Sequence, residues 1–488
     1  SGRSTSDDWL QLLTDLQTLG RVWEAFGWLD LLEQNYGPQH AYERKRRTLE
    51  SQLGKESVTL VSFEKVSKLA AGIDRFPSPG ADWTWKSLSA RNRTLTTDKL
   101  QSSRVSTIRF VENSEIAGVR FEFSDGTERG LTRRILEFVG GGIGIIDYDL
   151  DGFEDVVFTQ GLGIESGVSN IEEENDLLFR NLEGKRFASP ISLPLKRDAY
   201  GQGIAIGDVN DDGFPDIYIA QTTENRLLIN SGDGTFLDAT DEWGISGEAW
   251  TTSCVIADFN GDGFNDIYDV NYLEGPDVFT RVCNQHGLEI QCKPTDFEPA
   301  RDRLWLNDGK GRFIRHDLPE IKAARGLGAT AFSIGDSRQQ YLFVANDTDP
   351  NFLLKFAWQE NGVSVDNLGL QSGIALNREG KAERSMGIAI ADLNGDGFQD
   401  FFVTNFLAET NTLYLSRGAE LFQDQTQLFG LEPLSYDLLG FGTQFFDADL
   451  DGIPEIFVAN GHVDDLRQLG KPYKMSQQLL TLDNSKLV

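Results

Sequence analysis

Beyond residue 106 the chain alternates short apolar runs with turns that are rich in Gly and Asp. Runs such as "GIGII", "DVVFT" and "DIYIA" are short and rich in β-branched residues, which predicts strands. The first 52 residues follow a different period. Apolar residues recur at helical spacing in "DDWLQLLTDLQTLGRVWEAFGWLDLLEQ", and "PQHAYERKRRTLESQL" predicts a further helix with Pro38 near its start. We therefore expect a small helical region followed by a long all-β region.

One acidic phrase recurs between the predicted strands. It fits D-x-[DN]-x-D-G-[FI]-x-[DE], and its copies start at Asp147, Asp208, Asp258, Asp392 and Asp447. A sixth equivalent stretch, "FSIGDSRQQYLFVAND" from Phe332, keeps the flanking runs and Asp336 but lacks the acidic loop. The long region is therefore built from internal repeats.

The spacing within the phrase suits a calcium ion. Positions 1, 3 and 5 supply carboxylate or amide oxygens, and Gly at position 6 allows a sharp turn. The backbone carbonyl at position 7 and the acid at position 9 complete an all-oxygen shell, which favours Ca²⁺ over zinc or copper. We predict about five Ca²⁺ ions per chain, one in each loop. The predicted ligands are Asp147, Asp149, Asp151, Phe153, Asp155, Asp208, Asn210, Asp212, Phe214, Asp216, Asp258, Asn260, Asp262, Phe264, Asp266, Asp392, Asn394, Asp396, Phe398, Asp400, Asp447, Asp449, Asp451, Ile453 and Glu455.

An EF-hand loop begins in the same way but needs Glu at position 12 and helices on both sides. Position 12 is Phe158 in the first copy and Ile219 in the second, and the flanking runs are strand-like. Each unit is therefore predicted as strand, calcium loop, strand. The alternative is an acidic hairpin turn that holds no metal.

The loop belongs to a longer repeat. Phrases such as "NRLLINSGDGTFLDATDEWGI" and "DRLWLNDGKGRFIRHDL" predict two further strands joined by a Gly-containing turn. A unit of four short strands over roughly 50–75 residues is typical of a β-propeller blade. Six inner strands are expected to begin near Gly142, Gly203, Thr252, Thr330, Gly387 and Gly442. The last unit lacks a strand, which "STIRFVENSEIAGV" from Ser106 could supply; a seventh blade of atypical sequence stays open.

These phrases resemble FG-GAP (VCBS) repeats, the calcium-binding blades of the integrin α-subunit propeller. "GGGIGIIDYDLDGFEDVVF", "ERSMGIAIADLNGDGFQDFFVTNF" and "GFGTQFFDADLDGIPEIFVANGHV" are most similar to the cartilage acidic protein and the ASPIC/UnbV-type proteins. The resemblance covers about Ser106 to the C-terminus and implies a calcium-binding propeller. The altered loop near Asp336 implies one blade without metal. That family often continues into a further C-terminal domain, whose function is expected to be absent here.

The predicted domain organisation has three parts. Residues 1–52 form an α-helical hairpin or a degenerate tetratricopeptide-like cap. Residues 53–105 form an irregular linker or strap, as "FPSPGADW" indicates. Residues 106–488 form the propeller, closed by N- and C-terminal strands. The expected fold class is all-β with a small helical N-terminal region.

Charge limits the partners. The formal net charge is −31, which argues against nucleic acid, because phosphate binding needs a basic face. We find no apolar run of membrane-spanning length.

Of the three cysteines, Cys283 and Cys292 are interpreted as a loop disulfide, with reduced thiols or a zinc site near His286 as alternatives. Cys254 is expected to be buried. Calcium loops and a disulfide favour a secreted, periplasmic or cell-surface location.

Polar residues follow several of the second strands and are expected to line one face of the ring near its axis. They are Asn271, Tyr272, Asn346, Asp347, Asn405, Asn460 and His462. Asp347 and His462 are the candidates for catalysis, although a hydrogen bond to a neighbouring blade is the favoured explanation of His462. No G-x-S-x-G motif is present.

Two functions remain. The first is a calcium-stabilised, non-catalytic propeller that binds a protein or glycan at one face, as an adhesion, interaction or scaffold module. The second is an enzyme or biosynthetic accessory factor with a site in the axial pocket. Fold alone does not decide between them.

Overall fold

The computed structural model describes residues 13–14, 29, 40–52, 108, 110–124, 134–161, 175–194, 199–285, 288–334, 339–359, 362–418, 420–463, 473–483 and 486–488. The chain divides into two compact units: Ser1–Arg104 with Tyr148–Gly152 and Asn230–Thr235, and the remainder. In the first unit, α3 (His40–Gln52) is the helix predicted after Pro38. Most of the preceding predicted helical segment, and all of the predicted linker (residues 53–105), lie outside the described residues.

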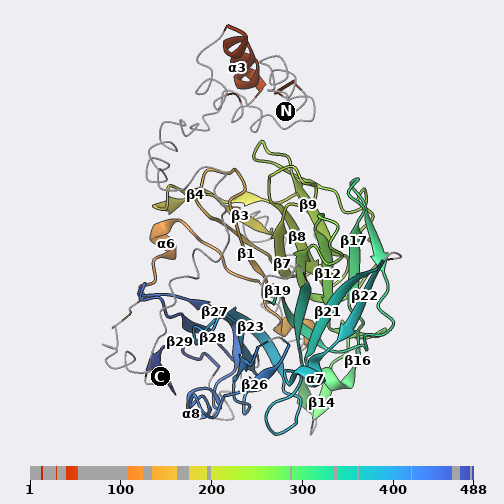
Figure 1. Cartoon of the computed structure of the whole chain (residues 1–488), viewed down its shortest axis with the longest axis vertical. Coiled ribbons are helices and arrows are strands. Elements are labelled where there is room, and N and C mark those ends of the chain that lie inside the picture. The colour runs from red at the N-terminus through yellow and green to blue at the C-terminus, as the bar shows by residue number, and fades with distance from the viewer. Residues whose placement is uncertain are drawn as a thin grey trace. The chain divides into compact units, whose positions relative to one another are not determined.

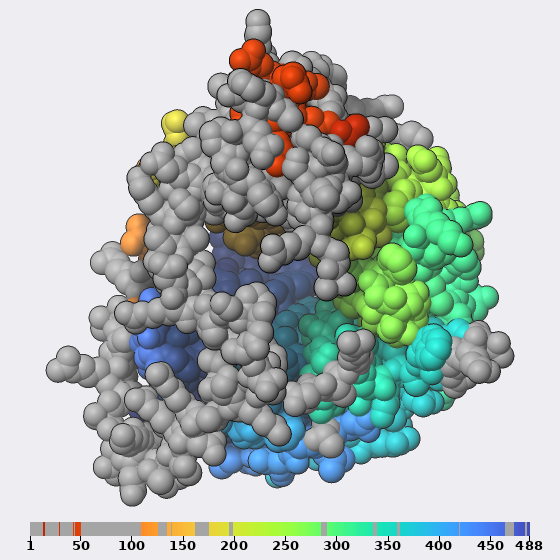
Figure 2. Space-filling view, turned by 45° about the horizontal axis from the view of Figure 1, so that its top comes forward, coloured from red at the N-terminus to blue at the C-terminus, as the bar shows by residue number. Residues whose placement is uncertain are grey.

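The second unit is a β-propeller of six antiparallel sheets, which confirms the predicted fold class (Figure 1). Blades 1 to 5 have four strands, and three strands are described in the sheet of blade 6. The first strands of successive blades contact one another from blade 1 to blade 6. They start one or two residues from the predicted positions, except in blade 4, where the strand starts at Gly326, ahead of the predicted Thr330. In Figure 2 the green to blue blades follow one another around the ring in chain order.

Within each blade the strands lie side by side in chain order. Blade 1 contains β1 (Ile143–Ile146), β2 (Asp155–Phe158), β3 (Leu177–Phe179) and β6 (Ile191–Ser192). Blade 2 contains β7 (Gly201–Gly207), β8 (Asp216–Gln221), β9 (Arg226–Asn230) and β10 (Phe236–Asp238). Blade 3 contains β11 (Thr251–Ala257), β12 (Asp266–Asn271), β17 (Arg303–Asn307) and β18 (Phe313–His316). Blade 4 contains β19 (Gly326–Ser333), β20 (Gln340–Asn346), β21 (Phe352–Gln359) and β22 (Gly362–Asn367). Blade 5 contains β23 (Ser385–Ala391), β24 (Asp400–Asn405), β25 (Thr412–Ser416) and β26 (Phe422–Asp424). Blade 6 contains β27 (Gly440–Phe446), β28 (Glu455–Asn460) and β29 (Gln478–Leu480).

Short elements decorate the blades. The small two-stranded sheets are β4 (Asn181–Leu182) with β5 (Arg186–Phe187), β13 (Leu273–Glu274) with β16 (Glu298–Pro299), β14 (Cys283–Gln285) with β15 (Leu288–Ile290), and β30 (Leu482–Asp483) with β31 (Lys486–Leu487). The short helices of this unit are α6 (Ser114–Ala117), α7 (Gly369–Ser372), α8 (Glu432–Ser435), and the 3₁₀ turns η3 (Ile135–Phe138) and η5 (Pro294–Asp296).

The core lies between successive blades. Every residue of β8, β12 and β24 is buried, because each strand has neighbours on both edges and blades against both faces. One buried carboxylate ties blades 2 and 3: Asp269 accepts hydrogen bonds from the Tyr218 hydroxyl at 2.9 Å and from Trp305 Nε1 at 2.7 Å. Two strong donors satisfy this carboxylate, so its burial is tolerated.

The junction between blade 6 and blade 1 differs from the others. Of residues 106–119, the segment predicted to supply a strand here, Ile108 and residues 110–119 are described, and they contain α6 but no strand. Residues 105–107 and 109 lie outside the described part, so strand donation by them stays a prediction. Phe110 contacts Phe446 and Phe457 of blade 6, with ring centroids 6.1 and 6.5 Å apart. Figure 1 shows α6 on the left, between β4 and β27. Residues 110–124, which we call the strap, therefore lie at this junction.

Candidate metal centres and axial polar cluster

The five acidic loops are the hairpin connections between the first and second strands of blades 1, 2, 3, 5 and 6. In each, the residue before position 1 pairs with the acid at position 9, as Ala391 pairs with Asp400 in blade 5. The acid at position 9 is consequently the first residue of the second strand. All five predicted ligand sets therefore lie on equivalent hairpins of the repeat.

Backbone N–H groups curl each loop inward, as the blade-5 loop illustrates. Asp392 at position 1 accepts from the N–H groups of Asp396 at 3.0 Å and Gly397 at 2.8 Å. Asp396 at position 5 accepts from Phe398 N–H at 2.9 Å. The same bonds recur in the loops of blades 2, 3 and 6. This arrangement gathers the acidic side chains on the inner side of the turn.

The acid at position 9 is buried in all five blades, and in blade 3 it bonds both to the loop and to the third strand. In blade 3, Asp266 accepts from Phe259 N–H at 3.0 Å and from Asn307 N–H, at the end of β17, at 2.8 Å. Burial raises the pKa of Asp266 to about 7, although these N–H groups oppose the shift. Burial likewise raises the pKa of Asp400 to about 6. A nearby cation would offset the cost of burying these carboxylates.

The donor set fits a hard cation. The carboxylate oxygens of Asp447, Asp449 and Glu455 in blade 6 lie within 4.8 Å of one another, and those of Asp147, Asp149 and Asp155 in blade 1 do the same. Carboxylates this close repel one another unless they are protonated or share a cation. Oxygen donors alone, converging on one turn, suit Ca²⁺.

Position 4 of each loop carries a feature that the sequence analysis missed. Its backbone is left-handed in all five loops, with φ of 55° at Leu150, 58° at Asp211, 77° at Gly261, 71° at Gly395 and 60° at Leu450. Residues other than Gly, Asn and Asp rarely adopt this conformation. The Gly found there in two copies was the available signal. The exposed leucines show that the loop shape is imposed by its hydrogen bonds and not by local preference.

Blade 4 is held by protein contacts. The altered loop of this blade includes residues 335–338, which lie outside the described part of the chain. Its outer strands, β21 and β22, are longer than those of the other blades. Glu420 of blade 5 accepts from the Tyr341 hydroxyl and from Lys355 Nζ of blade 4, each at 2.6 Å. These bonds tie blade 4 to blade 5 without an ion.

The asparagines predicted to line the axial face are structural instead. Asn271, Asn346 and Asn405 are fully buried, and Asn460 is 7% exposed. Each amide donates to a backbone carbonyl that precedes the third strand of its own blade: Arg301, Pro350, Thr410 and Ser476, respectively, at 2.7–2.9 Å. The side chains therefore close the connection between the second and third strands. Sequence position alone could not distinguish this role from that of a lining residue.

Asp347, the first of the two candidates for catalysis, is a buried carboxyl group with a tyrosine partner. It is 6% exposed, and Oδ2 accepts from the Tyr272 hydroxyl at 2.7 Å. Burial raises the pKa of Asp347 to about 6. Its Oδ1 and the indole N–H of Trp250 have no hydrogen-bond partner among the described residues, and the Trp250 and Tyr272 rings are 5.2 Å apart. This group could hold a small polar molecule.

His462 lies on blade 6, whereas Asp347 lies on blade 4. His462 is 8% exposed, and its ring meets Phe406 of blade 5 edge-on at 6.3 Å. Its backbone N–H donates to the Tyr473 carbonyl at 2.9 Å. The imidazole is thus packed against a neighbouring blade.

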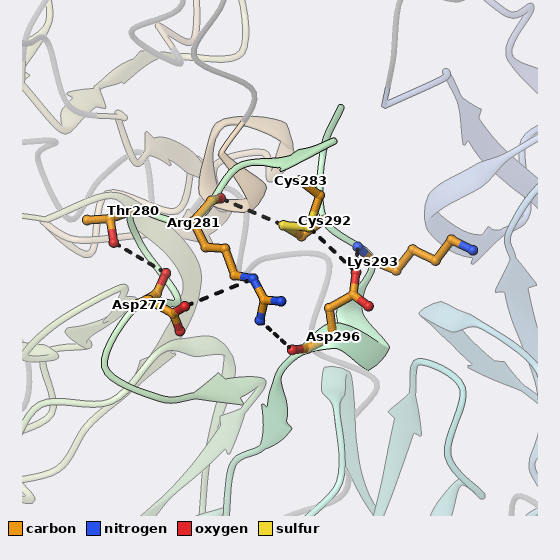
Figure 3. The surroundings of a disulfide bond; sticks show 7 residues. All are labelled: Asp277, Thr280, Arg281, Cys283, Cys292, Lys293 and Asp296. Carbon is orange, nitrogen blue, oxygen red and sulfur yellow. Dashed lines mark hydrogen bonds and ion pairs between the residues drawn. A yellow bond between two sulfur atoms is a disulfide. The ribbon is translucent and has the colours of Figure 1, made fainter. Parts of the chain in front are cut away.

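The predicted disulfide is confirmed. Cys283 and Cys292 are bonded, with a Sγ–Sγ distance of 2.09 Å, and Cys254 is buried and free. The bond rules out the reduced-thiol and zinc alternatives for this pair. Figure 3 shows Arg281 reaching Asp277 and the Asp296 carbonyl beside it. This insertion of blade 3 belongs to the same core cluster as Trp250 and Tyr272, and its Phe279 ring lies 5.6 Å from that of Trp250.

Comparison with protein families identifies the repeats. A family model described as FG-GAP-like repeat matches residues 147–219, 208–268 and 392–458, which hold all five loops. The chain thus carries FG-GAP-like repeats on a six-blade propeller. A search of curated proteins gives no match. Among the described residues, no helix is long and apolar enough to cross a membrane.

Several solved structures are distantly similar. An Agrocybe aegerita lectin that recognises non-reducing terminal N-acetylglucosamine matches with a TM-score of 0.38 and 15% identity, covering 70% of this chain and 80% of that one. A putative exo-β-1,3-galactanase from Bifidobacterium bifidum gives a TM-score of 0.33 and 9% identity, covering 71% and 90%. A mutant of AofleA from Arthrobotrys oligospora gives 0.35 and 9%, covering 68% and 82%.

Proposed function

We propose that the chain is a calcium-stabilised propeller that acts outside the cytoplasm as an interaction module for a protein or glycan. The observation that carries the proposal is the fivefold recurrence of one acidic loop at the same hairpin position. The same backbone bonds recur in the loops of blades 2, 3, 5 and 6, and carboxylate oxygens converge in those of blades 1 and 6. A loop that served only as a turn would not need an acid at positions 1, 5 and 9 in all five copies.

Calcium would act on stability. Each ion would sit between the turn and the first residue of the second strand, so its ligands hold two strands together. Position 9 extends this clamp to the third strand, as Asp400 does by accepting from Ser416 N–H at 2.8 Å. Any ligand that binds only the folded state stabilises that state.

The proposed location of the protein rests on the supply of calcium that the loops need and on the oxidising surroundings that the disulfide needs. Loops of modest affinity fill where calcium is abundant, and the Cys283–Cys292 bond persists in oxidising surroundings. Together they support a secreted, periplasmic or cell-surface location. ASPIC/UnbV-type membership is supported by the phrase resemblance alone.

The partner would bind at one face of the ring, where the connections between strands are gathered. The acidic balance of −31 disfavours nucleic acid. A glycan array and a panel of extracellular matrix and cell-surface proteins, both probed in calcium and in EDTA, test the proposal. Binding that requires calcium is expected. A chain that binds no probe in calcium but turns over a substrate contradicts an interaction role.

One observation favours a second candidate, an enzyme or accessory factor acting at the axial cluster. Asp347 is buried and accepts from the Tyr272 hydroxyl, and its burial raises its pKa to about 6; carboxyl groups with such perturbed pKa values are enriched at functional sites. The variant Asp347→Asn keeps the shape and removes the titration. Unchanged stability together with a lost activity would support this candidate. A neutral or merely destabilising effect supports a structural role.

A further inference from the structure

Most of the described junctions between blades show the same close packing at one position of the inner strand. A Cβ added to Gly142, Gly203, Gly328 or Gly387 would lie 2.1–2.9 Å from the inner strand of the next blade. In blade 6 the equivalent residue is Gly442, and no described atom lies within 4 Å of its Cβ position. The inner strand of blade 6 therefore does not pack on blade 1 in this way.

Blade 1 shows the complementary feature. Ile143 and Ile145 in β1 are 60% and 54% exposed. The equivalent Ile204 and Ile206 of blade 2 are partly buried, because Gly144 of blade 1 packs on them. The position that Gly144 occupies in blade 1 is occupied in blade 6 by Gln444, whose side chain is longer and exposed. Within the described part of the chain, the inner half of this junction thus leaves apolar side chains of β1 exposed.

The strap contacts both blades of the same junction. At its start, Phe110 meets blade 6 through its ring contacts with Phe446 and Phe457. At its end, Phe121 stacks on Phe158 of blade 1 at 4.6 Å. Gln160 of blade 1 fastens the strap twice: Nε2 donates to the Glu122 carbonyl at 3.0 Å, and Oε1 accepts from Ser124 N–H at 2.7 Å.

We propose that residues 110–124 are a releasable strap that closes the ring, and that the junction between blades 6 and 1 is the place where the ring opens. Opening would uncover Ile143 and Ile145 further and would leave blades 2 to 5 packed. The contact of the strap with blade 6 is weaker than its contact with blade 1, since Phe110 and Val111 are 60% and 74% exposed. Regions with little buried apolar contact open first.

Two matched glycine substitutions test the strap. A Cβ at Gly161 would lie 2.1 Å from the Ser124 carbonyl oxygen of the strap, a backbone atom that cannot rotate away. Gly461 occupies the equivalent position in blade 6, and no described atom lies within 4 Å of its Cβ position. Neither glycine has a positive φ. Gly161→Ala should therefore release the strap, whereas Gly461→Ala is the control.

Hydrogen exchange measured in calcium is the readout. In Gly161→Ala, amide protection should fall by at least about tenfold in the strap, β1 and β27, and should stay unchanged in β11 and β19. Gly461→Ala should match the wild type. Unchanged protection in Gly161→Ala, or an equal loss in all blades, would overturn the proposal.

A second comparison does not depend on releasing the strap. Ile145→Ser changes an exposed residue of β1, and Ile390→Ser changes its partly buried counterpart in β23. The urea midpoint should fall clearly for Ile390→Ser and little for Ile145→Ser. Equal falls would mean that blades 6 and 1 pack in solution like the other pairs, which would also overturn the proposal.

Discussion

The substitution Asp396→Asn separates a metal ligand from a turn residue. Asp396 is at position 5 of the blade-5 loop, and its Oδ1 accepts from Phe398 N–H at 2.9 Å. Asn keeps that acceptor and the side-chain shape but removes the negative charge. The folded state without metal should therefore be nearly unaffected, whereas calcium should bind far more weakly in this loop.

The size of the effect follows from linkage. A site with a dissociation constant of about 10 μM contributes about 2.7 kcal/mol at about 1 mM calcium. Unfolding entropy of about 2.1 cal/mol/K per residue, over roughly 380 propeller residues, gives about 0.8 kcal/mol/K. Losing one site should then lower the melting temperature by about 3 °C in calcium and by less than about 0.5 °C in EDTA.

Thermal melting followed by circular dichroism measures both values. Asp449→Asn is the matched control, since blades 2, 3 and 5 naturally carry Asn210, Asn260 and Asn394 at that position. It should keep most of the calcium stabilisation. An equal loss for Asp396→Asn in calcium and in EDTA would refute the ligand assignment and leave the residue with a role in the turn only.

Three further outcomes are expected. Glu420→Gln weakens the tie between blades 4 and 5, and urea unfolding should show a loss of about 0.5–1 kcal/mol that is the same with and without calcium; a loss seen only in calcium would be contrary. Asp302 accepts from Tyr268 and Asn271, and burial raises its pKa to about 7. The protonated Asp302 carboxyl stabilises the folded state fully below its unfolded pKa, near 3.8, and this stabilisation is lost as the pH rises towards 7. Asp302→Asn should therefore flatten the decline of the unfolding free energy between these two pH values. Parallel curves for the variant and the wild type would contradict the assignment. The Cys283–Cys292 bond closes a short loop of sequence separation 9. Replacing both cysteines by Ala should cost about 2–3 kcal/mol and abolish the effect of reductant; a remaining response to reductant would point elsewhere.

The repeat explains why so much of the fold could be predicted from sequence. Each Asp-rich loop fixes the end of one strand and the start of the next, so the inner strands starting at Gly201 and Ser385 follow from the loops at Asp208 and Asp392. The acid at position 9 was predicted as a ligand, but its bond to the third strand depends on tertiary register and could not be predicted from spacing.

Other features depend on contacts that a phrase does not encode. The strap resembles a fourth-strand phrase, yet its described residues form α6 and ring contacts, because Phe110 meets Phe446 and Phe457. Leu450 adopts a left-handed backbone that its side chain disfavours. Asn346 looked like a lining residue but donates to the Pro350 carbonyl.

Metal content tests the central claim most directly. The purified chain, dialysed against calcium and then against metal-free buffer, is measured by native mass spectrometry and elemental analysis. The account predicts about five calcium ions per chain, lost on chelation together with thermal stability. No bound calcium, or a melting temperature that EDTA leaves unchanged, would contradict the account.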